Sequence, residues 1–232
     1  MYCFEGSRFV KFAAVVVILM LGLSTGAYAQ SRPGKSELHF LYAFGAQTGA
    51  QAGGKIIPVQ NETTLRSGDR LKLFIEPRAE LYFYLVHLSS QGDLTPLFPV
   101  DSKPARIAPG SQVFLPEGSQ WFELDAHPGP EKFFMLVSAE RLERLEELCG
   151  RHLTLKDKSE AQSSADAIQN EIKHLRQQYK QLSAPAEKPV RIGGSVRGQP
   201  PAGAPVAPDV TPLAAEVTAP GFYSRTFSID HR

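Results

Sequence analysis

The side chains that could perform chemistry are few and scattered. Glu171 and His174 form a Glu-x-x-His unit, which di-iron bundles use, but such a site needs a second copy and two more carboxylate helices. No nucleophile elbow and no His-Glu-x-x-His zinc motif occurs. The six histidines, at 39, 87, 127, 152, 174 and 231, include no close pair with metal-ligand spacing. We therefore expect no catalytic residue, no metal and no cofactor.

Three other features have structural interpretations. His87 lies inside an apolar run, which favours a hydrogen-bonded core or face residue over a ligand. The glycines of 192–198 faintly resemble a phosphate loop, but the Gly-Lys-Ser/Thr ending is missing, which favours a linker. Cys149 lies on an apolar helical stripe, which favours a buried, inert thiol over a disulfide between chains.

The composition places limits on fold and partners. The 232 residues suffice for one domain with appendages or for two small domains, and 42% of them are hydrophobic. Because 25 Lys and Arg balance 24 Asp and Glu, the simplest argument for nucleic-acid binding is absent. The many aromatic residues could form a platform for a sugar, a peptide or a single strand, but they are more typical of a β-sheet core.

The first 29 residues have the order of a secretory signal peptide. Arg8 and Lys11 precede the uncharged apolar run 12–23, and small residues stand at 27 and 29 before a cut between Ala29 and Gln30. We expect export to the periplasm or beyond, with membrane contact through this segment only. An uncleaved anchor is the alternative.

Residues 30–140 have the pattern of an antiparallel β-sandwich, Ig-like or barrel-like. Short runs of alternating hydrophobicity are separated by Pro and Gly turns. The runs 81–88 and 131–137 are apolar on both faces, which is typical of central strands. Gly92 lies in the loop of a hairpin predicted between 81–88 and 94–98.

The remaining residues change pattern twice. A helical appendage is expected over 141–182, with a first helix capped by Ser138 and stopped by Gly150, and a second over 160–182. Residues 183–221 are rich in Pro and Gly and predict a linker. Alternation resumes over 222–232, which predicts a strand returning to an open sheet edge, although docking on a partner is also possible.

Three motifs lie between residues 65 and 99: a Ser-Gly-Asp-x-Leu turn and strand, a Tyr-x-Tyr-Leu strand, and a Gly-x-Leu-x-x-Leu-Phe-Pro hairpin. Their residues are Gly68, Asp69, Leu71, Tyr82, Tyr84, Gly92, Leu97, Phe98 and Pro99. With the segments 107–116 and 133–138, this pattern resembles the bacterial domain of unknown function 4384 family over residues 60–140. Such domains are β-rich and non-catalytic, so the resemblance implies structural roles for these residues.

We therefore expect a stand-alone, secreted module without catalysis that binds a protein or envelope partner. A structural accessory of the envelope is one alternative. A hydrolase or sugar-active enzyme with an unrecognised site is another. The sequence identifies no partner and no oligomeric state.

Overall fold

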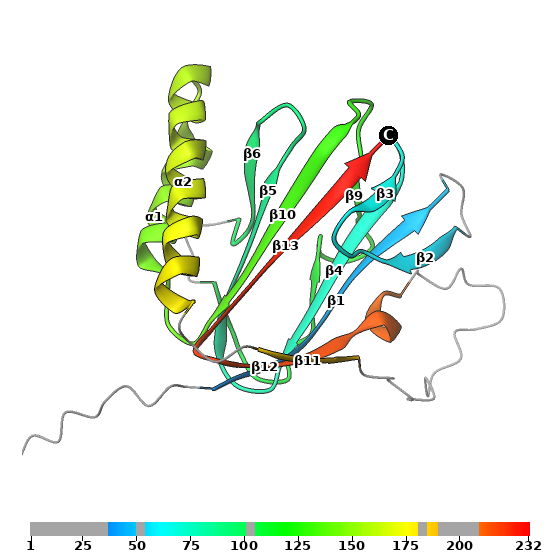
Figure 1. Ribbon diagram of the computed structural model, residues 1–232, viewed down its shortest axis with the longest axis vertical. Coiled ribbons are helices and arrows are strands. Elements are labelled where there is room, and N and C mark those ends of the chain that lie inside the picture. Colours follow the sequence, from blue (N-terminus) through cyan, green and yellow to red (C-terminus); the bar gives the residue numbers. More distant parts are fainter. Residues whose placement is uncertain (1–36, 50–53, 101–104, 181–184, 190–208) are drawn as a thin grey trace, which may run out of the picture. The chain divides into compact units, whose positions relative to one another are not determined.

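The computed structural model describes residues 37–49, 54–100, 105–180, 185–189 and 209–232 (Figure 1). The predicted signal peptide with its cut between Ala29 and Gln30 lies outside this part, as does the glycine-rich segment 192–198. Neither described helix has an apolar stretch long enough to cross a membrane.

The described strands form two separate sheets, which confirms the predicted β-rich sandwich. Sheet A has the order β11 (Ala186–Pro189), β12 (Ala215–Pro220), β1 (Glu37–Thr48), β4 (Arg70–Pro77) and β8 (Val113–Leu115), with β2 (Lys55–Pro58) on β1 and β9 (Phe122–Glu123) on β4. Sheet B has the order β3 (Thr63–Leu65), β13 (Phe222–His231), β10 (Gly129–Ser138), β5 (Leu81–Leu88) and β6 (Leu94–Phe98), with β7 (Arg106–Ile107) on β5.

The main core lies between the two sheets and follows from strand alternation. Successive side chains of a strand point to opposite faces, so every second residue of β1 and β4 enters the core. Phe40, Phe44 and Leu73 of sheet A meet Phe133 and Phe227 of sheet B there. As predicted, β5 and β10 are central strands, and β5 and β6 form an antiparallel hairpin pair.

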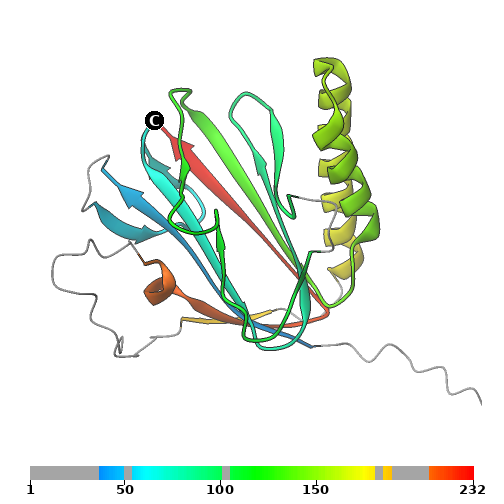
Figure 2. The same cartoon turned by 180° about the vertical axis from the view of Figure 1, so that it is seen from behind.

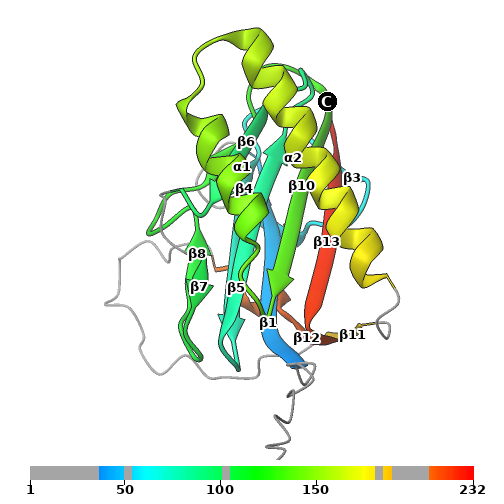
Figure 3. The ribbon, with the colours of Figure 1, turned by 90° about the vertical axis from the view of Figure 1, so that its left-hand side faces the viewer.

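Two helices cover the outer face of sheet B. Figure 3 shows α1 (Glu143–Thr154) and α2 (Lys158–Tyr179) lying across its strands. Buried apolar residues of both helices and of the sheet form a second core, which includes Tyr84, Leu145, Ile168 and Ile172. The sheet needs this cover because β5 and β10 are apolar on both faces.

The predicted ends of the helices are wrong in detail. Ser138 caps no helix, because it lies in β10, and the backbone N–H of Leu142 instead donates to the hydroxyl of Tyr84 at 2.9 Å. Gly150 lies inside α1 and does not stop it. The second helix begins at Lys158, where the carboxylate of Asp157 accepts hydrogen bonds from the N–H groups of the first turn.

The linker prediction for 183–221 is wrong for the described parts of that stretch. It contains β11, β12 and the single helical turn η1 (Thr211–Leu213), which lies on the side of the sandwich opposite α1 and α2 (Figure 2). Val210, just before η1, is buried against Gly45, where an added Cβ would lie 2.6 Å from its Cγ1 atom. The glycine therefore lets this turn approach the sheet.

The C-terminal strand is confirmed. Tyr223, Phe227 and Ile229 of β13 are buried in the main core, as their alternation predicts. The strand pairs along ten residues with β10 and also pairs, in parallel, with β3. Arg176 of α2 donates to the hydroxyls of Ser224 and Thr226 on its outer face, which attaches the helix to the strand.

Candidate functional site

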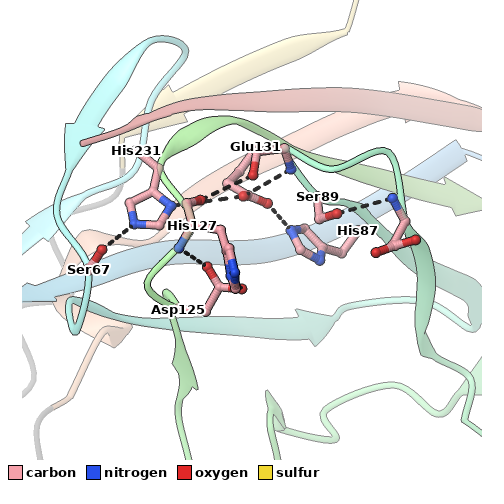
Figure 4. A network of polar contacts seen from close by, with 9 residues as sticks. Ser67, His87, Ser89, Asp125, His127, Glu131 and His231 are labelled. Atoms are coloured by element: carbon pink, nitrogen blue, oxygen red, sulfur yellow. Dashed lines mark hydrogen bonds and ion pairs between the residues drawn. The ribbon is translucent and has the colours of Figure 1, made fainter.

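A buried carboxylate organises a polar network at one end of sheet B (Figure 4). Glu131 of β10 is 4% exposed, and one of its oxygens lies 2.6 Å from Nε2 of His87 on β5. Its other oxygen accepts a hydrogen bond from the N–H of Ser90 at 3.0 Å. The ring of His87 stacks on Phe133. Burial lowers the pKa of His87, and the carboxylates of Glu131 and Asp125 oppose this shift.

The network continues to β13 and to the turn before β4. Nε2 of His231 lies 3.0 Å from the hydroxyl of Ser67, and its Nδ1 atom faces Glu131 at 3.9 Å (Figure 4). His231 is 2% exposed, and this Nδ1 has no hydrogen-bond partner among the described residues. Ser67, His231 and Glu131 thus lie side by side in the same spatial order as the serine, histidine and carboxylate of serine hydrolases.

Two requirements of serine catalysis are unmet around Ser67 in the described residues. The carboxylate lies beyond hydrogen-bond distance from the imidazole, although such distances can shorten when a substrate binds. An oxyanion hole needs free donors, but the N–H groups of Ser67, Gly68 and Asp69 already donate to the carbonyls of Arg232, Leu124 and Arg66. The geometry of the network therefore supports a structural role, in which its side chains connect neighbouring strands, better than a catalytic one.

A groove on the outer face of sheet A is the second candidate. Its volume is about 530 Å³. In the strand register, Glu216 of β12 lies opposite Leu41 of β1, which lies opposite Glu76 of β4. The next row of outward residues contains Phe74 of β4 and Phe114 of β8, which lie opposite each other with rings 5.1 Å apart. Two carboxylates thus flank an apolar floor.

The rim of this groove carries more acidic than basic groups. Besides Glu76 and Glu216, Asp209 lines it from the segment before η1, and Arg78 is the guanidinium among the lining residues. One oxygen of Glu76 accepts from Arg78 at 2.6 Å. A hydrogen bond with the partly exposed His39 lowers the pKa of Glu216. Glu216 is therefore ionised at neutral pH.

A further cavity of about 500 Å³ opens beside α1. Val100 and Leu153 line it and are 64% and 47% exposed. Cys149 also lines it but is buried, as predicted, and burial raises the pKa of its thiol to about 12. Val100 is the last described residue before 101–104, so part of the surroundings of this cavity lies outside the described residues.

The residues of the three sequence motifs do not form one site. Gly68 and Gly92 have positive φ angles of 83° and 88° in the turn before β4 and in the β5–β6 loop. Asp69 accepts hydrogen bonds from the N–H groups of Arg66 and Gly49 and so holds that turn. The remaining motif residues lie in β4, β5 and β6 and at the end of β6: Leu71, Tyr82, Tyr84, Leu97, Phe98 and Pro99.

The other residues considered from sequence remain apart. Glu171 and His174 lie on α2, and no group of three or more potential metal ligands occurs among the described residues. His87 is hydrogen-bonded, as predicted. Sequence reasoning missed the partners of His87 and the charged residues of the groove, because these meet only through strand pairing across the sheets. Phe74 and Phe114 of the groove were among the aromatic residues considered for a platform, but the sequence did not bring them together.

The comparisons with known proteins identify a domain without an assigned activity. The model of the family described as "Domain of unknown function (DUF4384)" matches residues 64–141. No curated protein and no solved structure matches the chain. The matched segment supplies β4, β8 and β9 of sheet A and β5, β6, β7 and β10 of sheet B, while β1, β12 and β13 complete the sheets from outside it. Over residues 64–141, from β3 to just before the helical pair, the chain is therefore similar to DUF4384 domains.

Proposed function

We propose that this protein is an exported, non-catalytic module that binds a protein or envelope partner through the outer face of sheet A. The groove on that face is the observation that carries the proposal. Leu41, Phe74 and Phe114 give it an apolar floor, and charged groups on its rim can fix the orientation of a partner. Binding sites typically combine these two features.

Export is part of the proposal and is supported by the order of charged, apolar and small residues in 1–29. The secreted protein is expected to begin at Gln30, which N-terminal sequencing of the extracytoplasmic fraction measures. A protein that keeps residues 1–29 and fractionates with membranes would contradict cleavage and favour the retained anchor.

Site-specific photo-crosslinking tests the binding face. A photoreactive amino acid at Gln112, on the rim of the groove, is expected to capture one defined partner in producing cells. The same amino acid at Glu147 of α1, which lines the cavity beside that helix and not the groove, is the matched control and is expected to capture none. Equal capture from both positions, or capture from Glu147 alone, would contradict binding through sheet A. A partner that depends on α2 would favour the structural accessory.

The hydrolase alternative rests on the alignment of Ser67, His231 and Glu131. We expect a fluorophosphonate probe, which labels activated serines, to leave the purified protein unmodified. Intact-protein mass spectrometry measures this, with Ser67→Ala as the control for the labelled position. Stoichiometric labelling that the Ser67→Ala variant abolishes would overturn the non-catalytic proposal.

A further inference from the structure

The outer face of sheet A combines a surplus of acidic groups with an apolar floor. Glu76, Asp209 and Glu216 line the same groove, and Arg78 is already paired with Glu76. We infer that the groove takes a short peptide segment of a partner that places a lysine or arginine among these carboxylates and an apolar side chain against Phe114. This inference rests on the proposed binding function and names its chemistry.

The strand register brings two of these carboxylates toward one cation. Glu76 and Glu216 lie on either side of Leu41, with β1 between their strands. Neighbouring strands are about 4.8 Å apart, so a cation above Leu41 lies within one strand spacing of each carboxylate-bearing strand. Asp209 lines the same cavity from the segment before η1. An anionic ligand would instead meet three carboxylates, which outnumber the guanidinium of Arg78 that is paired with Glu76.

The apolar floor of the groove fits the apolar part of such a peptide. Leu41 and Phe74 are buried at the base, while Phe114 is partly exposed at the β8 side. A lysine side chain packs its methylene groups along apolar surface and keeps its ammonium group at the polar rim. A volume of about 530 Å³ holds a few side chains. The groove therefore recognises an amphipathic segment better than a simple cation.

The single tryptophan of the chain reports on this groove. Trp121 packs in the same apolar cluster as Leu41, Phe74 and Phe114. Its fluorescence is followed while a capped pentapeptide of alternating leucine and lysine is added. Two matched peptides carry glutamate in place of lysine or serine in place of leucine. The leucine–lysine peptide is expected to bind at least about tenfold more tightly than either, and to weaken as salt rises.

Charge-removing variants locate the binding. Glu216→Gln and Asp209→Asn are each expected to raise the Kd of the leucine–lysine peptide about two- to fivefold, because each removes one partly solvated charge interaction. Glu147→Gln, the same change on α1, is expected to leave the Kd unchanged. Amide shifts of Leu41, Phe74 and Phe114 in NMR spectra give a second readout that does not depend on Trp121.

The outcomes separate this inference from the proposed function. Three results would each overturn the inference that the ligand is basic and apolar. They are equal binding of the lysine and glutamate peptides, a loss of affinity in Glu147→Gln as large as in the groove variants, and no binding of any peptide. If crosslinking at Gln112 still captures a partner, binding through this face stands and only the chemistry of the ligand is wrong. If both experiments fail, the proposed function fails with it.

Discussion

The outer faces of the two sheets differ in the side chains that they present. The outward residues of β5 and β10 in sheet B include Tyr84, Val86 and Leu136, which α1 and α2 bury completely. Those of β4 in sheet A include Lys72, Phe74 and Glu76. The described cover over this region is η1 with its neighbours and the segment 116–121, in which the carbonyls of Gly118 and Gln120 accept hydrogen bonds from the buried Lys72. One apolar residue between two charged ones does not require a helix. The partly exposed Glu76, which lines the groove, thus marks the part of this face that can remain open to a partner.

The helix-covered face should be far more sensitive to truncation than the turn-covered face. Ile168→Ala, in α2, is expected to lower the free energy of unfolding by about 2–5 kcal/mol, because a fully buried side chain leaves a cavity. Leu213→Ala, in η1, is expected to cost less than about 1.5 kcal/mol, because this side chain is already partly exposed. Urea unfolding compares them. Equal losses would show that the two covers contribute alike.

The close approach of η1 to sheet A can be broken by one methyl group. Gly45→Ala is expected to destabilise the protein by about 1–3 kcal/mol, because the new Cβ would overlap Val210. Adding Val210→Ala removes the 2.6 Å overlap with Cγ1, so the double variant should lose less stability than the sum of the two single variants. Thermal unfolding of the single and double variants measures this coupling. Simple additivity of the two losses would contradict the contact.

The two sheets also carry His–Glu pairs with the same 2.6 Å separation but different burial: His39–Glu216 on the outer face of sheet A, and His87–Glu131 on the inner face of sheet B. Glu131→Gln is expected to cost about 1–3 kcal/mol, because a buried amide cannot accept from both His87 and Ser90 as the carboxylate does. Glu216→Gln, in the exposed pair with His39, is expected to leave the unfolding free energy unchanged. Chemical denaturation at pH 7 measures both, and a larger loss for Glu216→Gln would reverse the comparison.

The buried pair should also make stability depend on pH. Burial holds the pKa of His87 below its ordinary 6.5, so the unfolded chain binds a proton more readily than the folded one. This contribution is complete above pH 6.5 and is lost as pH falls towards the lowered pKa of the folded state. His87→Gln should flatten the profile of unfolding free energy between pH 7 and about 5.

His174→Gln, on the exposed side of α2, is the control for this profile and should keep its slope. A profile that both variants flatten equally would assign the dependence to another group. A profile that neither variant flattens would show that the charge state of His87 does not contribute.

The sequence pattern predicted where most of the strands lie, but it did not predict which strands pair with one another. Alternation predicted β4, β5, β10 and β13 well, because burial on one or both faces leaves a period of two. β12 was missed because its two inward residues, Val217 and Ala219, lie in a stretch rich in Pro, Gly and Ala. Its pairing with β1, far away in the sequence, decides its structure, and no local propensity signals that pairing.

The candidate sites were less predictable than the fold. Glu131 follows His87 by 44 positions, and the groove joins residues of β1, β4, β8, β12 and the segment before η1. Spacing in the sequence says nothing about such contacts. The helix caps failed for a similar reason, since the N–H of Leu142 is satisfied by Tyr84 of a distant strand.

The position of β13 has a consequence for how the chain acquires its structure during synthesis. This strand is made after β5 and β10, yet it lies beside β10 and supplies Phe227 and Ile229 to the main core. β1, the first described strand, likewise pairs with β12, which is synthesised much later. The sandwich therefore cannot close cooperatively until the ribosome has released the segment up to His231. Such non-local pairing slows folding and leaves the earlier strands exposed for longer. A chain in this state is therefore more prone to aggregate than one whose sheets close early.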